Sequence, residues 1–138
     1  MVKVSGAVII ELLGNRGDPV RFTCDNTNPS ITKGDLLFLI DPRKVSGANL
    51  ATGASAGIAS ADKESGDGAT SVAVWTNGIF DIVTGEAGLG VGTLARISGG
   101  NYVVAATAAQ LLSGMVLCKT LEAGDANEYI ACRLGSLV

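Results

Sequence analysis

Short apolar runs separated by turn residues recur along the whole chain. Residues 20–24 alternate apolar and polar side chains, which is typical of a strand with one buried face. Residues 36–40 are apolar throughout and end at Asp41-Pro42, which indicates a strand buried on both faces. Further runs occupy residues 2–13, 57–61, 70–76, 79–83, 93–98, 102–106, 115–121 and 128–134. The spacing predicts an all-β fold, a compact β-barrel or β-sandwich of about nine to ten short strands.

Turn signals join several of these runs. Gly99-Gly100-Asn101 and residues 122–127 each stand between two runs, so two hairpins are predicted there. Asn77-Gly78 lies between two alternating runs and is the strongest local hairpin signal in the chain. Residues 107–112 are expected to form at most one short helix. Residues 43–56 are rich in small and polar residues and are interpreted as a surface excursion.

Length and composition favour one domain spanning residues 1–138. Hydrophobic residues make up 47% of the chain and aromatic residues only 4%, so Ala, Val, Leu and Ile must fill the core. A chain of 138 residues buries about two-thirds of its surface on folding, which is enough for a core without disulfides. Residues 1–13 are interpreted as an N-terminal arm or as the first strand.

Charge and cysteine content narrow the possible partners and compartment. The net charge is −3 and the ten basic residues are scattered, whereas nucleic-acid binding needs a basic patch, so no nucleic acid is expected. No apolar run reaches about 18 residues, so no membrane span is expected. The three cysteines are an odd number without metal-binding spacing, which favours free buried thiols in a reducing cytosol. Cys118 and Cys132 alone have a spacing that allows them to face each other across a hairpin.

The residue combinations that usually carry catalysis are not evident in this sequence. The chain has no histidine, which removes the commonest general base and metal ligand, and with it every Ser-His-Asp or Cys-His triad. The glycine-rich residues 88–93 end in Thr93 and therefore fail the dinucleotide-binding pattern. Trp75 and Phe80 are expected in the core. We therefore expect no enzyme activity, no catalytic, cofactor-binding or metal-ligating residues, and no small-molecule substrate.

Four stretches, in this order, resemble the small capsid decoration (cement) proteins of tailed phages, a group with a lambda-decoration-like, tulip-shaped β-fold. These stretches are residues 32–39, residues 72–82, residues 89–94, and the closing part formed by residues 112–117, 122–125 and 130–134. The resemblance covers roughly residues 20–138, and the segment 42–56 departs from it. In the second stretch the resemblance favours a strand that continues through Gly78 with a bulge over a hairpin at Asn77-Gly78.

The resemblance implies a structural virion protein made in the host cytoplasm and located on the outer surface of an assembled bacteriophage capsid. Its implied partners are the major capsid protein and further copies of itself in a homotrimer. A tail or adaptor β-barrel is the alternative within virion structure. A ligand-binding β-barrel is a third hypothesis, but it needs exposed aromatic platforms and the chain has few aromatic residues.

The N-terminal segment is the candidate contact with the capsid or a neighbouring subunit. An apolar segment ahead of the decoration-like region is suited to strand addition, a mode in which backbone hydrogen bonds supply the affinity. The residues assigned to this contact are Val2, Lys3, Val4, Ser5 and Gly6. An ordinary first strand uses the same residue types, so that alternative stays open.

Overall fold

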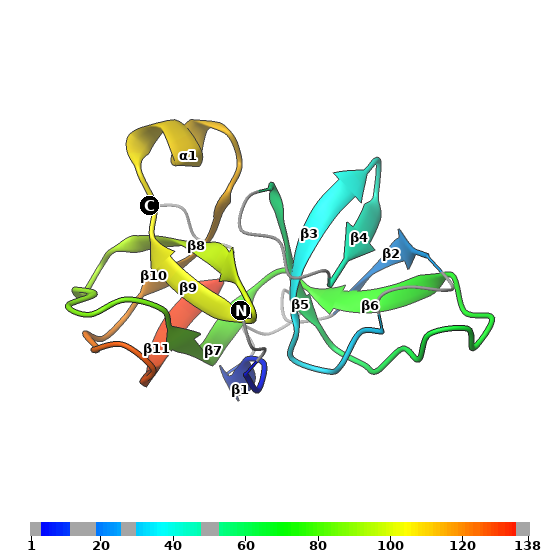
Figure 1. The fold of residues 1–138 in the computed structure, drawn as a ribbon, viewed down its shortest axis with the longest axis horizontal. Coiled ribbons are helices and arrows are strands. Elements are labelled where there is room, and N and C mark those ends of the chain that lie inside the picture. Colours follow the sequence, from blue (N-terminus) through cyan, green and yellow to red (C-terminus); the bar gives the residue numbers. More distant parts are fainter. Residues whose placement is uncertain (1–3, 12–18, 26–29, 48–52, 135–138) are drawn as a thin grey trace.

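The computed structural model describes residues 4–11, 19–25, 30–47 and 53–134, which form eleven strands and one short helix. The strands make two closed sheets that lie side by side (Figure 1). The all-β prediction with at most one short helix is therefore confirmed, with eleven strands in place of the nine to ten expected.

The first closed sheet, called barrel 1, holds five strands in the order β2-β4-β3-β5-β6. Its strands are β2 (Val20–Cys24), β3 (Leu36–Asp41), β4 (Lys44–Ser46), β5 (Ser55–Ala59) and β6 (Ser71–Trp75). The first and last of them pair antiparallel, with Val20 opposite Val74, and this pairing closes the barrel. Each strand is short, because five twisted strands close tightly around a small interior.

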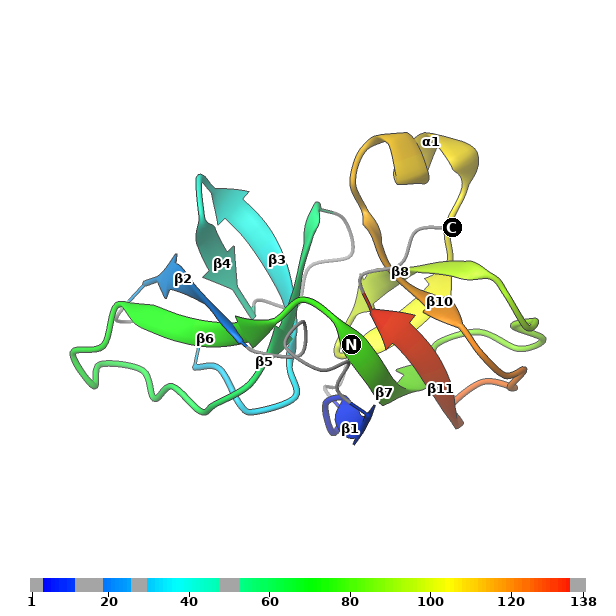
Figure 2. The same cartoon turned by 180° about the vertical axis from the view of Figure 1, so that it is seen from behind.

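The second closed sheet, called barrel 2, is built from β7-β11-β10-β8-β9, and a β7–β9 pairing closes the ring. Its strands are β7 (Gly78–Thr84), β8 (Leu94–Gly99), β9 (Tyr102–Ala105), β10 (Val116–Thr120) and β11 (Tyr129–Leu134). One more strand, β1 (Val8–Glu11), pairs antiparallel with β7. Barrel 1 is therefore inserted in the sequence between two strands that pair with each other, which Figure 2 shows from behind.

Two apolar cores hold this arrangement together. Barrel 1 has an interior core of its own, made of Cys24, Ile31, Leu37, Val45, Ala59, Val72 and Val74. A larger core fills barrel 2 and continues into the joint between the barrels, where Leu36, Phe38, Ile58 and Trp75 of barrel 1 join it. Strand β3 contributes to both, since Leu37 points into barrel 1 while Leu36 and Phe38 belong to the shared core. This explains the unbroken apolar run of β3.

Asn101 is the polar centre of the joint. Its side-chain oxygen accepts a hydrogen bond from the backbone N–H of Leu36 at 3.0 Å. Its side-chain nitrogen donates to Asp35 Oδ1 at 3.0 Å and to the backbone oxygen of Val4 at 3.1 Å. Asn101 has φ = 68°, a left-handed conformation that asparagine tolerates better than most residues. One side chain therefore ties barrel 1, barrel 2 and the N-terminal segment together.

The predicted turns have mixed outcomes. The hairpins at 99–101 and 122–127 are confirmed as β8–β9 and β10–β11. Of the two alternatives at Asn77-Gly78, the hairpin is wrong, because β6 and β7 belong to different barrels and do not pair. The chain instead continues forward, with Gly78 at φ = 129°. The excursion predicted over residues 43–56 contains strand β4 and the start of β5, so it is less irregular than expected.

The short helix α1 (Ala108–Leu112) confirms the prediction over residues 107–112. Its first turn has a capping box, in which the Thr107 hydroxyl accepts from Gln110 N–H and the Gln110 side chain accepts from Thr107 N–H. None of its residues is buried, and Leu112 is 88% exposed. Figure 1 shows α1 standing clear of barrel 2, so local capping rather than core packing stabilises it.

Candidate functional site

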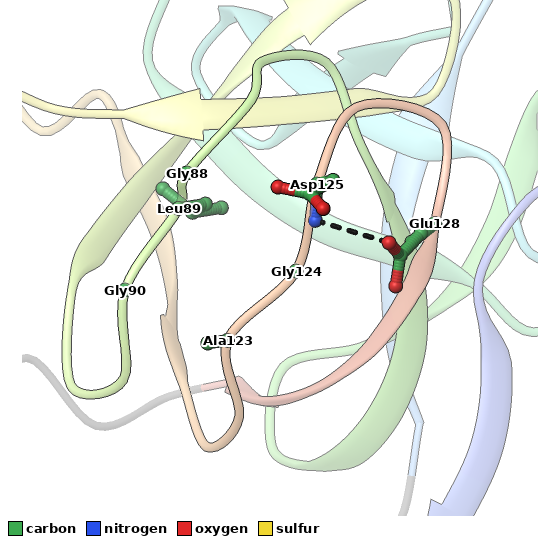
Figure 3. A pocket seen from close by; sticks show the side chains of 7 residues that line it. All are labelled: Gly88, Leu89, Gly90, Ala123, Gly124, Asp125 and Glu128. Carbon is green, nitrogen blue, oxygen red and sulfur yellow. Dashed lines mark hydrogen bonds between the residues drawn. The ribbon is translucent and has the colours of Figure 1, made fainter.

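A pocket of about 310 Å³ opens at the end of barrel 2, between the β7–β8 and β10–β11 loops (Figure 3). Its lining is Gly88, Leu89, Gly90, Ala123, Gly124, Asp125 and Glu128. The two loops are joined by a pair of backbone hydrogen bonds between Leu89 and Gly124, each 3.0 Å long. Asp125 and Glu128 both lie on the β10–β11 loop, where the Asp125 N–H donates a hydrogen bond to Glu128 Oε1 at 3.4 Å. The pocket is therefore a small acidic hollow with a mostly backbone wall.

Close packing beneath this pocket sets its shape. The Thr84 hydroxyl, at the end of β7, donates to the backbone oxygen of Asp125. A Cβ added at Gly124 would lie 2.5 Å from the Ile130 side chain, so only glycine fits at this point of the loop. Glycine at 124 thus lets the β10–β11 loop press against the barrel, which holds the two carboxylates at its rim.

The acidic hollow does not contain a set of metal ligands. Within the described ranges 4–11, 19–25, 30–47 and 53–134, no three His, Cys, Asp or Glu side chains are grouped to hold a metal ion. In the same ranges no helix is long and apolar enough to cross a membrane. What the hollow offers to a ligand is two carboxylates and the backbone groups of two loops.

All three cysteines are buried free thiols. Cys118 and Cys132 lie on the adjacent strands β10 and β11, with Cys118 opposite Leu134 and Cys132 opposite Thr120, so the two thiols are diagonal neighbours. The hydrogen bond with Cys132, together with burial, raises the pKa of the Cys118 thiol well above its usual value. Burial also raises the pKa of Cys24. The raised pKa of Cys118 and Cys24 favours their protonated form, which is the poorly nucleophilic one.

A second hollow, of about 330 Å³, lies beside β1 and is lined by Ala7, Val8, Ile9, Lys33 and Trp75. The Lys33 ammonium lies 5.9 Å from the centre of the Trp75 ring. Trp75 itself is only 6% exposed and stacks at a tilt on Phe80, with ring centres 5.5 Å apart. Both aromatic residues are thus core residues, as expected.

Comparisons with known proteins give no assignment. No protein-family model matches this chain. No curated protein matches it either. The resemblance to capsid decoration proteins therefore stays a prediction that rests on the order of the four motifs described above.

The predicted contact residues lie partly inside the described structure. Val2 and Lys3 fall outside the described residues. Val4 lies at the joint, where its N–H donates to Gly100 O at 3.1 Å and its oxygen accepts from Asn101. Ser5 is exposed, and Gly6 lies so close to Gly34 that an added Cβ would be 2.2 Å from the Gly34 oxygen. The segment from Val4 to Gly6 therefore has partners within its own chain.

Strand β1 is a further candidate contact surface, which the sequence did not distinguish from the rest of the N-terminal segment. Its residues pair with β7 on one edge, and its other edge pairs with no described strand. Val8 and Ile10 point outward and are 54% and 50% exposed. The alternation of residues 8–11, with Ile9 against the core, was the signal available in the sequence.

Proposed function

We propose that this protein is a non-enzymatic structural protein that binds the outer surface of an assembled phage-type capsid and stabilises it, acting as a homotrimer. The observation that carries the proposal is the edge of β1 that no described strand covers, with exposed Val8 and Ile10, directly after the predicted contact segment. An open strand edge beside apolar side chains is suited to strand addition by another chain.

The rigid framework around this edge supports the same proposal. Two closed barrels share a core, and Asn101 fixes the N-terminal segment to both barrels. A cement protein needs such a preformed surface, because ordering a flexible segment on binding costs free energy. Because Val4 is bound within its own chain, the contact we propose consists of the predicted residues Val2 and Lys3, exposed Ser5 and the edge of β1.

Stabilisation follows from binding the assembled shell better than its dissociated subunits. At a free concentration of one hundred times Kd, each occupied site contributes about 2.7 kcal/mol. Sites repeated over a lattice act together through multivalency, so weak individual contacts are sufficient.

Imaging purified protein mixed with undecorated, expanded phage heads tests the proposal. We expect density at regular lattice points and greater resistance of the heads to heat. Removing residues 2–6 is expected to weaken head binding while circular dichroism shows an intact fold, whereas unfolding of this variant would favour an ordinary first strand. Absence of binding at saturating concentration, or location of the protein in the tail, would replace the proposal with the tail or adaptor function.

Exposed aromatic residues, which a carbohydrate-binding barrel needs, are scarce on this surface. Phe38, Trp75 and Phe80 are buried, while Phe22 and Tyr102 are partly buried. Tyr129 alone among the six aromatic residues is exposed, at 48%. The structural proposal therefore has more support than the ligand-binding one.

A further inference from the structure

Two basic side chains lie directly opposite each other on the outer face of barrel 2. The register pairs Lys119 of β10 with Arg133 of β11; Lys119 is partly exposed and Arg133 is exposed. Figure 2 looks onto these two strands beside β7. Like charges at directly opposed positions destabilise an antiparallel pair. Positive charge is therefore concentrated here at a cost to the isolated chain.

This basic pair, Lys119 and Arg133, is not neutralised within the described residues. The ion pairs found there are Lys44–Asp25 at 2.5 Å and Lys63–Asp67 at 3.3 Å, both in barrel 1. Two carboxylates lie near the pair: Asp81 of β7 is opposite Ala131 and so diagonal to Arg133, and Glu122 accepts a hydrogen bond from the Ala131 N–H at 2.7 Å. Neither carboxylate forms an ion pair with Lys119 or Arg133. The positive charge remains available to a partner.

The loops 85–93 and 121–128, together called the acidic end of barrel 2, carry negative charge. They contain no basic residue and four acidic ones: Glu86, Glu122, Asp125 and Glu128. Backbone N–H groups of Ala105, Ala131 and Asp125 hold three of these carboxylates in place. Figures 1 and 2 both show these loops at the end of barrel 2 that faces away from barrel 1. Val91, in the 85–93 loop, is 69% exposed.

We propose that copies of this chain associate through barrel 2, with the acidic end of one copy docked on the basic pair of the next. The two surfaces are complementary in charge, and exposed apolar residues lie at the acidic end, with Val91 and Leu121 in its loops and Tyr129 directly after them. They are different surfaces of one chain, so the contact is heterologous, and such contacts repeat until a ring closes. The inference rests on the proposed homotrimer and identifies its interface.

Sedimentation of the purified full-length chain without phage heads tests this contact. We expect self-association to be measurable when the protein concentration is raised to about 0.5 mM. The association should weaken about tenfold or more between low and high salt, because complementary surface charges are screened. The double variant Lys119→Glu/Arg133→Glu should be monomeric. The double variant Asp125→Lys/Glu128→Lys should be monomeric as well, and mixing the two double variants should restore association.

A matched control places the same change of charge on barrel 1. Arg21→Glu/Lys33→Glu alters two exposed basic residues away from the interface and should associate like the unmodified chain. A monomeric unmodified chain at every concentration, or association that survives the substitutions at 119 and 133, would overturn the proposal. Circular dichroism of each variant separates loss of contact from loss of fold. Head binding by the unmodified chain is measured separately, so failure of this interface and failure of the capsid function are distinguishable.

Discussion

Replacing Asn101 by alanine is expected to weaken the whole molecule, because this side chain makes three hydrogen bonds at the joint between the barrels. Asn101→Ala leaves the buried N–H of Leu36 without its acceptor, a loss worth about 1–3 kcal/mol. Asp35, which is 1% exposed, also loses a donor to its carboxylate. Alanine at φ = 68° adds roughly 1 kcal/mol of backbone strain.

These contributions together predict a loss of about 3–5 kcal/mol in the free energy of unfolding, a large part of the 5–15 kcal/mol typical of a domain. Urea unfolding followed by Trp75 fluorescence is a direct assay, since Trp75 is the one tryptophan and lies in the shared core. Circular dichroism should report the same midpoint if the barrels unfold together.

Asn101→Gly is the matched control for backbone strain. Glycine accepts a positive φ without penalty, so this variant should lose about 1 kcal/mol less than the alanine variant. A loss below about 1 kcal/mol for Asn101→Ala would refute the reasoning, because it would mean that the joint does not depend on these hydrogen bonds.

Three further outcomes follow from the structure. Gly6→Ala places a Cβ 2.2 Å from Gly34 O and should lower the free energy of unfolding, measured in urea, by about 1–3 kcal/mol. In the control variant Gly90→Ala the Cβ meets one atom at 3.7 Å, so the free energy of unfolding should change by no more than about 0.5 kcal/mol. Equal effects of the two substitutions would contradict this. The hydrogen bond from the Ala69 N–H, assisted by the Lys63 ammonium, lowers the pKa of Asp67, so its contribution to stability is present above its ordinary value of 3.8 and is lost as pH falls through the lower folded pKa. In Asp67→Asn, the free energy of unfolding should therefore fall less steeply as the pH is lowered below 3.8. The same pH dependence in the variant and the unmodified chain would count against this reasoning. The two thiols of barrel 2 should resist a disulfide reagent at pH 8 in the native protein and react after unfolding, and rapid native labelling would show that they are accessible.

The sequence predicted the strands and the local turns better than the way they combine. Alternation identified β2 and β7, and glycine turns identified the β8–β9 and β10–β11 hairpins, since these depend on neighbouring residues alone. The division into two barrels depends on β6 and β7 separating at Asn77-Gly78. Asn-Gly favours a tight hairpin locally, but the shared core around Trp75 and Phe80 requires the chain to continue into the second barrel.

The candidate surfaces were predictable to a smaller extent. The sequence shows that both loops contain acidic residues and glycines. It does not show that the two loops lie side by side, because that depends on the backbone hydrogen bonds between Leu89 and Gly124. Lys119 and Arg133 are fourteen positions apart and become neighbours only through the strand register. Likewise, nothing in residues 4–6 indicated that Asn101 would hold them, because that contact joins distant parts of the chain.

The insertion of barrel 1 between β1 and β7 has a consequence for the order of folding. During synthesis β1 emerges about 70 residues before its partner, which at ordinary translation rates is a delay of roughly 4–14 s. Pairing of Ile9 with Phe80 across an unfolded chain of that length carries a high loop-closure cost. Folded barrel 1 holds Val20 opposite Val74, which shortens the effective loop to roughly 17 residues and lowers that cost by about 1.3 kcal/mol. Barrel 1 should therefore fold first, during synthesis, and its folding should bring β1 close to β7.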